Sequence, residues 1–455
     1  MERSSKKILL IVTAMGSFLA PFMGSAIVVA LPVLGAEFSM SAVSLTWVAM
    51  SYLLSAAVFL LPAGRLSDIF GRKHMFAGGI ALFGASSLLS AFSNSVSLLL
   101  VSRFIQGISG AMIFSSPMAM LMTAFKPDER GKAIGINVAS VYIGLSAGPF
   151  VGGIFTGQFG WRSIFILQSA LAFITLVPAV FMLEKETPAA SGEKFDWKGS
   201  LVYCAVLAAL MFGVTHLTLS YGAALAVAGF LGLFVFWQIE ERVEFPVFNA
   251  RLFMQNRVFA FSNLAALINY SATAAVGFIL SLYLQYIKGF SPQVSGLLLV
   301  VQPVIQAVFS PFAGRLSDKK EPQLIASFGM ALTAAGLFIL IFLDNSTPLW
   351  LIVFCLALMG FGFALFSSPN TNAVMSSVDR KFYGVASGIL GTMRLTGQMM
   401  SMAVATLVFS IVIGGLRITP ESHHLFLKSS RIVITVLAAM CVSGIFASLA
   451  RGKVR

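Results

Sequence analysis

Long apolar runs separated by short charged loops constrain this sequence more than any other feature. A helix needs about 20 apolar residues to cross the hydrocarbon core of a bilayer, whereas a barrel strand needs only about 9–11 alternating residues. The runs are long and uninterrupted, so they predict fourteen membrane-spanning helices. We place them at Ile8–Leu31, Ser44–Ala63, Met75–Phe92, Leu98–Phe125, Ala133–Thr156, Ile164–Leu183, Gly199–Thr215, Tyr221–Gln238, Phe259–Tyr286, Val294–Ala313, Gln323–Leu343, Leu349–Val378, Gly384–Leu416 and Ile432–Leu449.

Composition excludes the other classes of protein. Of the 455 residues, 58% are hydrophobic and 10% are charged, whereas a soluble domain carries about 25% charged residues. So few charges cannot cover a water-exposed surface, which excludes a soluble enzyme, a disordered chain and a secreted disulfide domain. Cys204, Cys355 and Cys441 all lie in apolar runs and form no ligand or disulfide pattern. We therefore expect an all-α integral membrane protein that needs neither a cofactor nor a metal.

The distribution of basic residues predicts the orientation of the chain. If the N-terminus is cytoplasmic, the inner segments hold 23 of the 30 Lys and Arg residues and the outer loops hold five. The remaining two, Arg103 and Arg394, lie inside apolar runs. This asymmetry follows the positive-inside rule and places both termini in the cytoplasm. The net charge of +13 is dispersed over many loops, so we expect a lipid bilayer as the partner and no nucleic acid.

A repeated pentapeptide predicts two structural halves. The sequence GRLSD occurs at 64–68, after the second run, and again at 314–318, after the tenth. Both copies follow the second run of a group of six, which is the signature of two structural halves of six helices each. We expect an N-terminal six-helix bundle at 1–186, a linker with two membrane helices at 187–244, and a C-terminal six-helix bundle at 245–455.

Five segments carry a resemblance to a known family. They are GRLSDIFGRKHMF (64–76), RFIQGISGA (103–111), GLSAGPFVGG (144–153), FPVFNARLFMQNRVF (245–259) and ASGILGTMRLTGQ (386–398). With them the chain resembles the major facilitator superfamily, and within it the fourteen-helix drug:proton antiporter branch. The resemblance implies an alternating-access transporter that exports small hydrophobic or amphipathic compounds. It also implies a monomer in the plasma (inner) membrane of a prokaryote, with protons as a further partner if transport is coupled.

The first GRLSD copy is expected to form a latch at the cytoplasmic mouth. Gly64 would let the second helix approach the other half closely, and Asp68 would accept hydrogen bonds from a helix N-terminus. Arg72 would pair with Asp68 or with Asp128. Ordinary solvated loop charge is the alternative. The second copy supplies a weaker latch through Gly314 and Asp318.

Small residues line one face of the fifth predicted helix. Gly144, Gly148 and Gly152 recur every four residues, and Pro149 beside them can bend the helix. Small residues at this spacing let membrane helices pack backbone to backbone. The resemblance implies that this face meets a helix of the opposite half, which we expect to be the tenth, and that it seals the closed transporter; plain packing is the alternative. Residues 144–148 also fit the G-x-S-x-G pattern of a hydrolase, but they lie mid-span without a His or carboxylate nearby, so no enzyme is expected.

Two arginines inside apolar runs are candidate functional residues. Arg103 lies near the outer end of the fourth run, where it either snorkels to the interface or faces the seam with the first and fifth helices. Arg394 lies near mid-depth of the thirteenth run, where an ionised residue should face protein or a water-filled cavity. We therefore expect Arg394 to line the transport path or to bond backbone carbonyls at a helix seam.

Neutral residues at depth complete the expected path. Alongside Arg394 it comprises Met23, Ser25, Asn269, Tyr270, Gln302 and Gln306. Asn370 and Asn372, after Pro369, are expected to interrupt the twelfth helix. Each polar residue could instead satisfy a neighbouring helix.

The chain departs from the resembled branch in its first helix. The segment FMGSAIVVALP (22–32) has Met23 where the branch carries an Asp, and no acidic residue lies inside any predicted run. A carboxylate at depth is the usual means of proton coupling. Its absence favours a neutral or anionic substrate. The alternatives that remain are an antiporter using a peripheral carboxylate such as Asp68, a proton-independent facilitator, and a non-transporting membrane sensor.

Overall fold

The structure is a computed structural model that describes residues 3–184, 190, 192–248, 250–379 and 383–452, without the side chains of 3–4, 127–128 and 250–252. Within that part of the chain, 14 helical segments are long and apolar enough to cross a membrane. The predicted all-α membrane fold with fourteen spans is confirmed.

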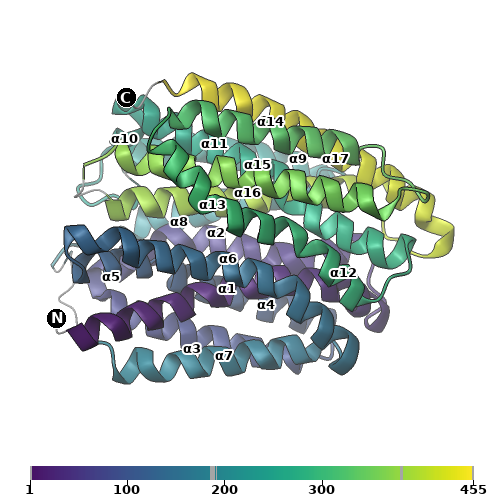
Figure 1. Ribbon diagram of the computed structural model, residues 1–455, viewed down its shortest axis with the longest axis horizontal. Coiled ribbons are helices and arrows are strands. Elements are labelled where there is room, and N and C mark those ends of the chain that lie inside the picture. The colour runs from purple at the N-terminus through teal and green to yellow at the C-terminus, as the bar shows by residue number, and fades with distance from the viewer. Residues whose placement is uncertain (1–2, 185–189, 191, 249, 380–382, 453–455) are drawn as a thin grey trace.

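Helices from the two ends of the chain form two separate groups (Figure 1). The first group comprises α1 (Arg3–Glu37), α2 (Ala42–Phe70), α3 (Arg72–Ala91), α4 (Val96–Phe114), α5 (Pro117–Ala124), α6 (Pro127–Phe159) and α7 (Arg162–Phe181). The second comprises α11 (Arg257–Leu282), the π-turn η1 (Tyr283–Ile287), α12 (Pro292–Leu299), α13 (Val301–Ser317), α14 (Pro322–Leu340), α15 (Leu349–Ser376), α16 (Tyr383–Val412), the 3-10 turn η3 (Pro420–Ser422) and α17 (His423–Ala450).

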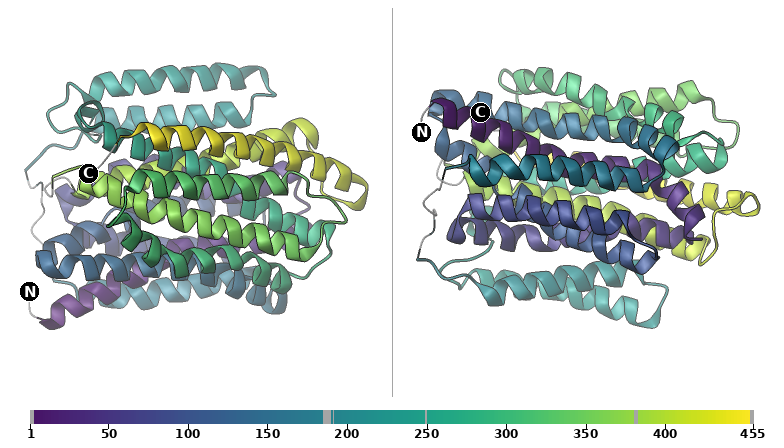
Figure 2. Two further views of the ribbon diagram at one scale, coloured as in Figure 1. Left: turned by 45° about the horizontal axis from the view of Figure 1, so that its top comes forward. Right: turned by 90° about the horizontal axis from the view of Figure 1, so that it is seen from below.

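The two linker helices stand beside these groups. Helices α8 (Trp197–Thr215) and α9 (Ser220–Glu240) pack on each other, and α8 also contacts α2 and α16. Figure 2 shows the pair, in teal, at the edge of the bundle. The short α10 (Ala250–Gln255) leads into α11. The proposed boundary at 186 and 187 lies outside the described residues, so the domain limits stay a prediction.

Both ends of the chain lie at the same end of the bundle. Helix α1 begins and α17 ends there (Figure 1), as an even number of spans requires. We call this the terminal end and the opposite one the far end.

The two GRLSD copies occupy equivalent places in the two groups. The Ser67 hydroxyl at the end of α2 lies 3.0 Å from the Ser116 hydroxyl beside α5. The Ser317 hydroxyl at the end of α13 accepts a hydrogen bond of 3.0 Å from the Asn372 amide of α15. In each half the second span is thus tied to the fourth by the same serine of the repeat.

Two of the described spans are divided, and a third continues through a proline. The fourth span is divided at Ser115 and Ser116, before Pro117 starts α5, and the tenth is divided at Val300. The expectation that Asn370 and Asn372 interrupt the twelfth span is wrong, because α15 continues through Pro369 as one helix. In a bundle, neighbouring helices and side chains can compensate for the backbone hydrogen bond that a proline removes.

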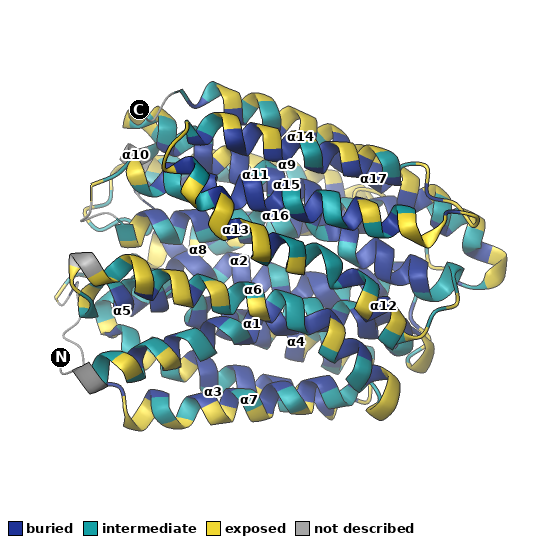
Figure 3. Cartoon of the chain, viewed as in Figure 1, coloured by how far each residue is buried: buried dark blue, intermediate teal, exposed yellow. Residues whose placement is uncertain are grey.

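Exposed residues lie along the outer faces of the helices (Figure 3), and many of them are large and apolar. On α9, for example, Phe230, Leu231 and Phe234 are all exposed. Such a surface is stable in lipid and not in water.

Candidate binding cavity

A large cavity lies between the two groups of helices. Its volume is about 1840 Å³, which exceeds the roughly 300–1,000 Å³ of an ordinary ligand pocket. Helices α1, α2, α4 and α6 line one side, and α11, α13, α15 and α16 line the other. Its walls extend to Ala190, Glu193 and Glu244, in the loops of the terminal end. The cavity therefore has its mouth at the terminal end.

Contacts between the groups close the far end. A Cβ added at Gly153 of α6 would lie 2.6 Å from the Pro292 carbonyl oxygen of α12. The Ser281 hydroxyl of α11 donates to the Val28 carbonyl of α1 at 2.8 Å. The Thr406 hydroxyl of α16 donates to Thr46 of α2 at 2.7 Å. Backbone approach and direct hydrogen bonds thus join the two halves beyond the bottom of the cavity.

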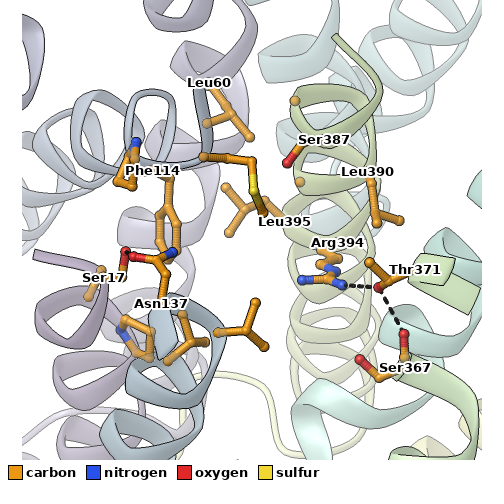
Figure 4. A pocket seen from close by; sticks show the side chains of 18 of the residues that line it. Ser17, Leu60, Phe114, Asn137, Ser367, Thr371, Ser387, Leu390, Arg394 and Leu395 are labelled. Carbon is orange, nitrogen blue, oxygen red and sulfur yellow. Dashed lines mark hydrogen bonds between the residues drawn. The ribbon is translucent and has the colours of Figure 1, made fainter. Parts of the chain in front are cut away.

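Arg394 projects from the middle of α16 into this cavity (Figure 4). Its Nη2 donates to the Thr371 hydroxyl at 2.9 Å, and its guanidinium lies 5.6 Å from the centre of the Tyr270 ring. Its Nε is buried and has no hydrogen-bond partner among the described residues. Ser17 and Asn137 lie across the cavity and bond to each other at 2.9 Å. Arg394 is therefore a positively charged group in the cavity wall.

The other residues expected along the path divide into two sets. Ser25, Tyr270, Gln302 and Gln306 line the cavity. The expectations for Met23 and Asn269 are wrong, because both side chains are fully buried away from it. Successive residues of a helix point about 100° apart, so the neighbours Gly24, Ser25 and Tyr270 face the cavity while Met23 and Asn269 face packed helices.

Charge is distributed unevenly along the cavity. Within the described chain its three acidic wall residues, Asp68, Glu193 and Glu244, all lie at the mouth. Glu193 forms an ion pair with Arg65 there. The charged residues deeper in the wall are Arg103 and Arg394. The bottom of the cavity is therefore electropositive.

Arg103 neither snorkels nor faces the first and fifth spans. It is 1% exposed, and its Nε donates to the Val48 carbonyl of α2 at 3.2 Å. Its guanidinium lies 4.8 Å from the Tyr52 ring and bonds to the Gln106 side chain. The expected partners are wrong because α4 packs on α2 and α3, so this face of α4 meets α2.

The GRLSD loop is braced within its own half. Arg72 donates to Asp68 through Nε at 3.1 Å and Nη2 at 3.0 Å, so the expected pairing is confirmed. The side chain of Asp128 lies outside the described residues. A Cβ added at Gly64 would meet nothing within 4 Å, so in this conformation α2 is not packed closely there. In the second copy, Asp318 accepts from Asn372 at 3.3 Å, and a Cβ added at Gly314 would lie 3.7 Å from Ser368 Oγ.

The glycine stripe of α6 faces α1 and not the opposite half. Added Cβ atoms would lie 2.7 Å from the Phe18 carbonyl oxygen at Gly144, 2.7 Å from the Phe22 carbonyl oxygen at Gly148, and 2.9 Å from the Ala26 Cα at Gly152. The expected contact of this stripe with the tenth span is therefore wrong.

A different face of α6 makes that contact. It uses Pro149, whose carbonyl touches Gly296 of α12, together with Gly153 and Gly157. Pro149 and Gly153 each follow a glycine of the stripe by one position, and Gly157 lies one helical turn after Gly153.

Sequence reasoning missed a hydrogen bond between the halves at mid-depth. The Tyr142 hydroxyl of α6 lies 3.2 Å from the Ser367 hydroxyl of α15, and both residues line the cavity. Thr371, which holds Arg394, was also missed. Polar residues inside apolar runs are the available signal, but serines and threonines also bond to their own helix and so do not reveal a cavity by themselves.

Comparisons with known proteins agree with this geometry. The family described as Major Facilitator Superfamily matches residues 13–256 and 262–450. The riboflavin transporter RibZ of Clostridioides difficile is 31% identical over 89% of this chain and 88% of its own length. The multidrug resistance protein Stp of Mycobacterium tuberculosis is 29% identical over 91% and 77%.

Two further similarities were found. The tetracenomycin C resistance and export protein of Streptomyces glaucescens is 26% identical over 89% of this chain and 76% of its own length. In fold, the chain is similar to a bacterial homologue of the human lysosomal transporter Spinster, with a TM-score of 0.71, 15% identity and coverage of 99% and 98%.

Proposed function

Because the chain belongs to the Major Facilitator Superfamily and has its alternating-access transporter fold, we propose that it exports small amphipathic compounds without a net positive charge. The protein is a multi-pass membrane transporter and not an enzyme. The observation that carries the substrate class is that Arg103 and Arg394 are the charged residues described in the deep part of the cavity wall.

Electrostatics favour anionic or neutral ligands over cations. Two unit charges 4 Å apart interact by about 4 kcal/mol at an effective dielectric constant of 20. A ligand cation beside Arg394 would meet repulsion of this order, with no carboxylate among the described deep residues to offset it. A carboxylate or a carbonyl oxygen would instead accept hydrogen bonds from the guanidinium.

The walls suit an aromatic or otherwise apolar ligand body. Phe114, Phe278 and Phe363 line the cavity with Met118 and Met375. Aromatic rings provide large contact areas, and the flexible thioether of Met adapts to different shapes. Small organic molecules also appear in the names of the relatives, which refer to riboflavin, multidrug resistance and tetracenomycin C.

Export is supported by two of those names and by the charge distribution. The relatives include a multidrug resistance protein and a resistance and export protein. The positive-inside rule favours a cytoplasmic terminal end, from which ligands would enter the open mouth. We place the chain in the plasma (inner) membrane of a prokaryote, as a monomer with both termini cytoplasmic. Labelling of single cysteines from either side of intact cells tests this orientation.

Flux into proteoliposomes tests the substrate class. One fluorescent aromatic scaffold would be compared as its carboxylate, its uncharged amide and its amine. We expect the carboxylate and the amide to be transported and the amine to be transported slowly. Fastest transport of the amine would refute the proposal.

Variants of Arg394 test the assigned residue. Arg394→Ala should abolish transport while membrane insertion remains normal, and Arg394→Lys should retain part of it because the charge is kept. Arg431→Ala is the matched control, since Arg431 is exposed on α17 away from the cavity. Full activity of Arg394→Ala would remove Arg394 from the path.

Energy coupling is tested in the same vesicles. Flux that is unchanged by an imposed pH gradient would identify a proton-independent facilitator. Flux driven by the gradient would identify an antiporter whose proton site lies outside the deep cavity, for example at Asp68.

A further inference from the structure

Two carboxyl groups meet where the linker helices return to the terminal end. Asp196 precedes α8 and caps it, because its Oδ1 accepts a hydrogen bond of 2.9 Å from the Gly199 amide. Glu240 is the last residue of α9 and is 2% exposed. Its Oε2 accepts a hydrogen bond of 2.7 Å from the Phe248 amide. Each carboxyl thus has one oxygen already bound to a backbone amide.

The two remaining oxygens face the same small space. A Cβ added at Gly199 would overlap both Asp196 Oδ2 and Glu240 Oε1. That Cβ would lie 2.2 Å from Asp196 Oδ2 and 2.3 Å from Glu240 Oε1, so the two oxygens are close neighbours. Both of these oxygens are buried, and neither has a hydrogen-bond donor in the described chain. Glycine at position 199 leaves the room that the pair needs.

Among the described residues, this pair of carboxyls has no countercharge. Neither carboxyl forms an ion pair within the described ranges. Of the charged neighbours in sequence, Lys194, Lys198, Glu241, Arg242 and Glu244 are exposed, and Glu241 accepts from the Trp237 indole. On the helices packed against α8, the charged side chains are engaged elsewhere: Arg65 with Glu193, Asp68 with Arg72, and Arg394 with Thr371. Tyr203 of α8 donates its hydroxyl to the Ala57 carbonyl.

Asp196 is half-buried and Glu240 is buried, and two adjacent carboxylates whose inner oxygens are shielded from water cannot both be ionised without a large electrostatic cost. An ionised carboxylate only accepts hydrogen bonds, so two of them leave both inner oxygens unsatisfied. One proton makes one carboxyl a hydrogen-bond donor to the other. It thereby removes both the repulsion between two negative charges and the lack of a hydrogen bond at the inner oxygens. We propose that Asp196 and Glu240 share one proton and form a proton-binding site of the linker helices, separate from the cavity.

This site is connected to the mouth of the cavity. Glu240 holds the amide of Phe248, and the preceding residues Glu244 to Val247 line the mouth. The centre of the Phe248 ring lies 5.9 Å from the centre of the Trp237 ring and 5.1 Å from that of the Phe253 ring. Loss of the shared proton leaves two negative charges that push the start of α8 away from the end of α9. The hydrogen bond between Glu240 and the Phe248 amide, which anchors residues 244–247 at the mouth, then weakens.

The sign of the pH effect follows from this arrangement. In this proposal the folded protein holds a proton between the two carboxyls, and the unfolded chain has no such site. The stabilising contribution of this proton is therefore complete under acidic conditions and is lost as the pH rises through the titration of the pair.

Infrared pH titration of the purified full-length protein tests the proposal. The wild type should show the stretching band of a buried protonated carboxyl, and this band should disappear as the pH rises. Glu240→Gln and Asp196→Asn should each remove the band, because each change leaves a single carboxyl. Glu241→Gln is the matched control and should keep it, since Glu241 is exposed. Persistence of the band in both pair variants would overturn the assignment.

Thermal unfolding gives a second measurement that does not depend on transport. The wild-type midpoint should fall by a few degrees across the infrared titration. Glu240→Gln should fold normally and remove this dependence, because its amide can donate to Asp196 as the protonated carboxyl does. A midpoint with the same pH dependence in this variant would contradict the proposal. So would a titration that shifts with added Na⁺ or Ca²⁺, because a metal cation would then bridge the pair.

Discussion

Closure of the far end depends on backbone contact between α6 and α12, and Gly153→Ala tests this directly. The added Cβ would lie 2.6 Å from the Pro292 carbonyl oxygen and 3.2 Å from the Gln293 Cα. Both are backbone atoms, so no side-chain rotation relieves the overlap. An ordinary contact begins at 3.4 Å, so the two helices would have to separate by roughly 0.8 Å in the closed state.

Overpacking of this kind raises the free energy of the packed state by about 1–3 kcal/mol. Because the halves separate at this contact when the far end opens, the cost falls on the closed state alone. The ratio of far-end-open to far-end-closed molecules should therefore rise about 5- to 150-fold.

Electron spin resonance distances between labelled cysteines at Phe92 and Trp350 measure this ratio. Both positions are exposed at the far end, in different halves. Gly135→Ala, on the same helix, is the matched control, because its Cβ would meet nothing within 4 Å. The reasoning is refuted if Gly153→Ala leaves the distances unchanged, or if Gly135→Ala opens the far end as strongly.

Three further predictions follow from individual contacts. Asp68→Asn removes the carboxylate that accepts two bonds from Arg72, so the exchange between the two open states should slow, as single-molecule fluorescence can measure. Gly148→Ala places a Cβ 2.7 Å from the Phe22 carbonyl oxygen and should lower stability by about 1–3 kcal/mol in a denaturation assay, whereas Gly131→Ala, with open space around it, should not. Burial lowers the pKa of Arg451 to about 10, so this residue is charged at neutral pH. Arg451→Met should lower the free energy of unfolding by about 1–3 kcal/mol, because it leaves the Asn370 side-chain oxygen unpaired. Arg431→Ala is the neutral control.

Periodicity and charge predicted the membrane fold well because both act locally. Apolar length determines whether a segment spans, and loop charge determines how it is oriented. The GRLSD repeat likewise predicted two halves, and the equivalent bonds of Ser67 and Ser317 agree with it. These features need no knowledge of which helix contacts which.

The direction of individual side chains was predicted less well. Arg394 lies on the cavity wall as its depth suggested, but Met23 and Asn269 do not. In lipid, an apolar helix has no single hydrophobic face that identifies its buried side, so sequence alone does not determine its rotation.

The Asp196–Glu240 pair illustrates the same division. The sequence alone determined that the chain crosses a membrane fourteen times, that basic residues gather in alternate loops, and that its apolar runs lack carboxylates. Only the tertiary structure decided that two carboxyls 44 positions apart in the chain meet over Gly199, that the α6 stripe faces α1, and that the cavity opens at the terminal end. Span length and charge are properties of each segment, whereas these contacts depend on how the helices rotate and pack against one another.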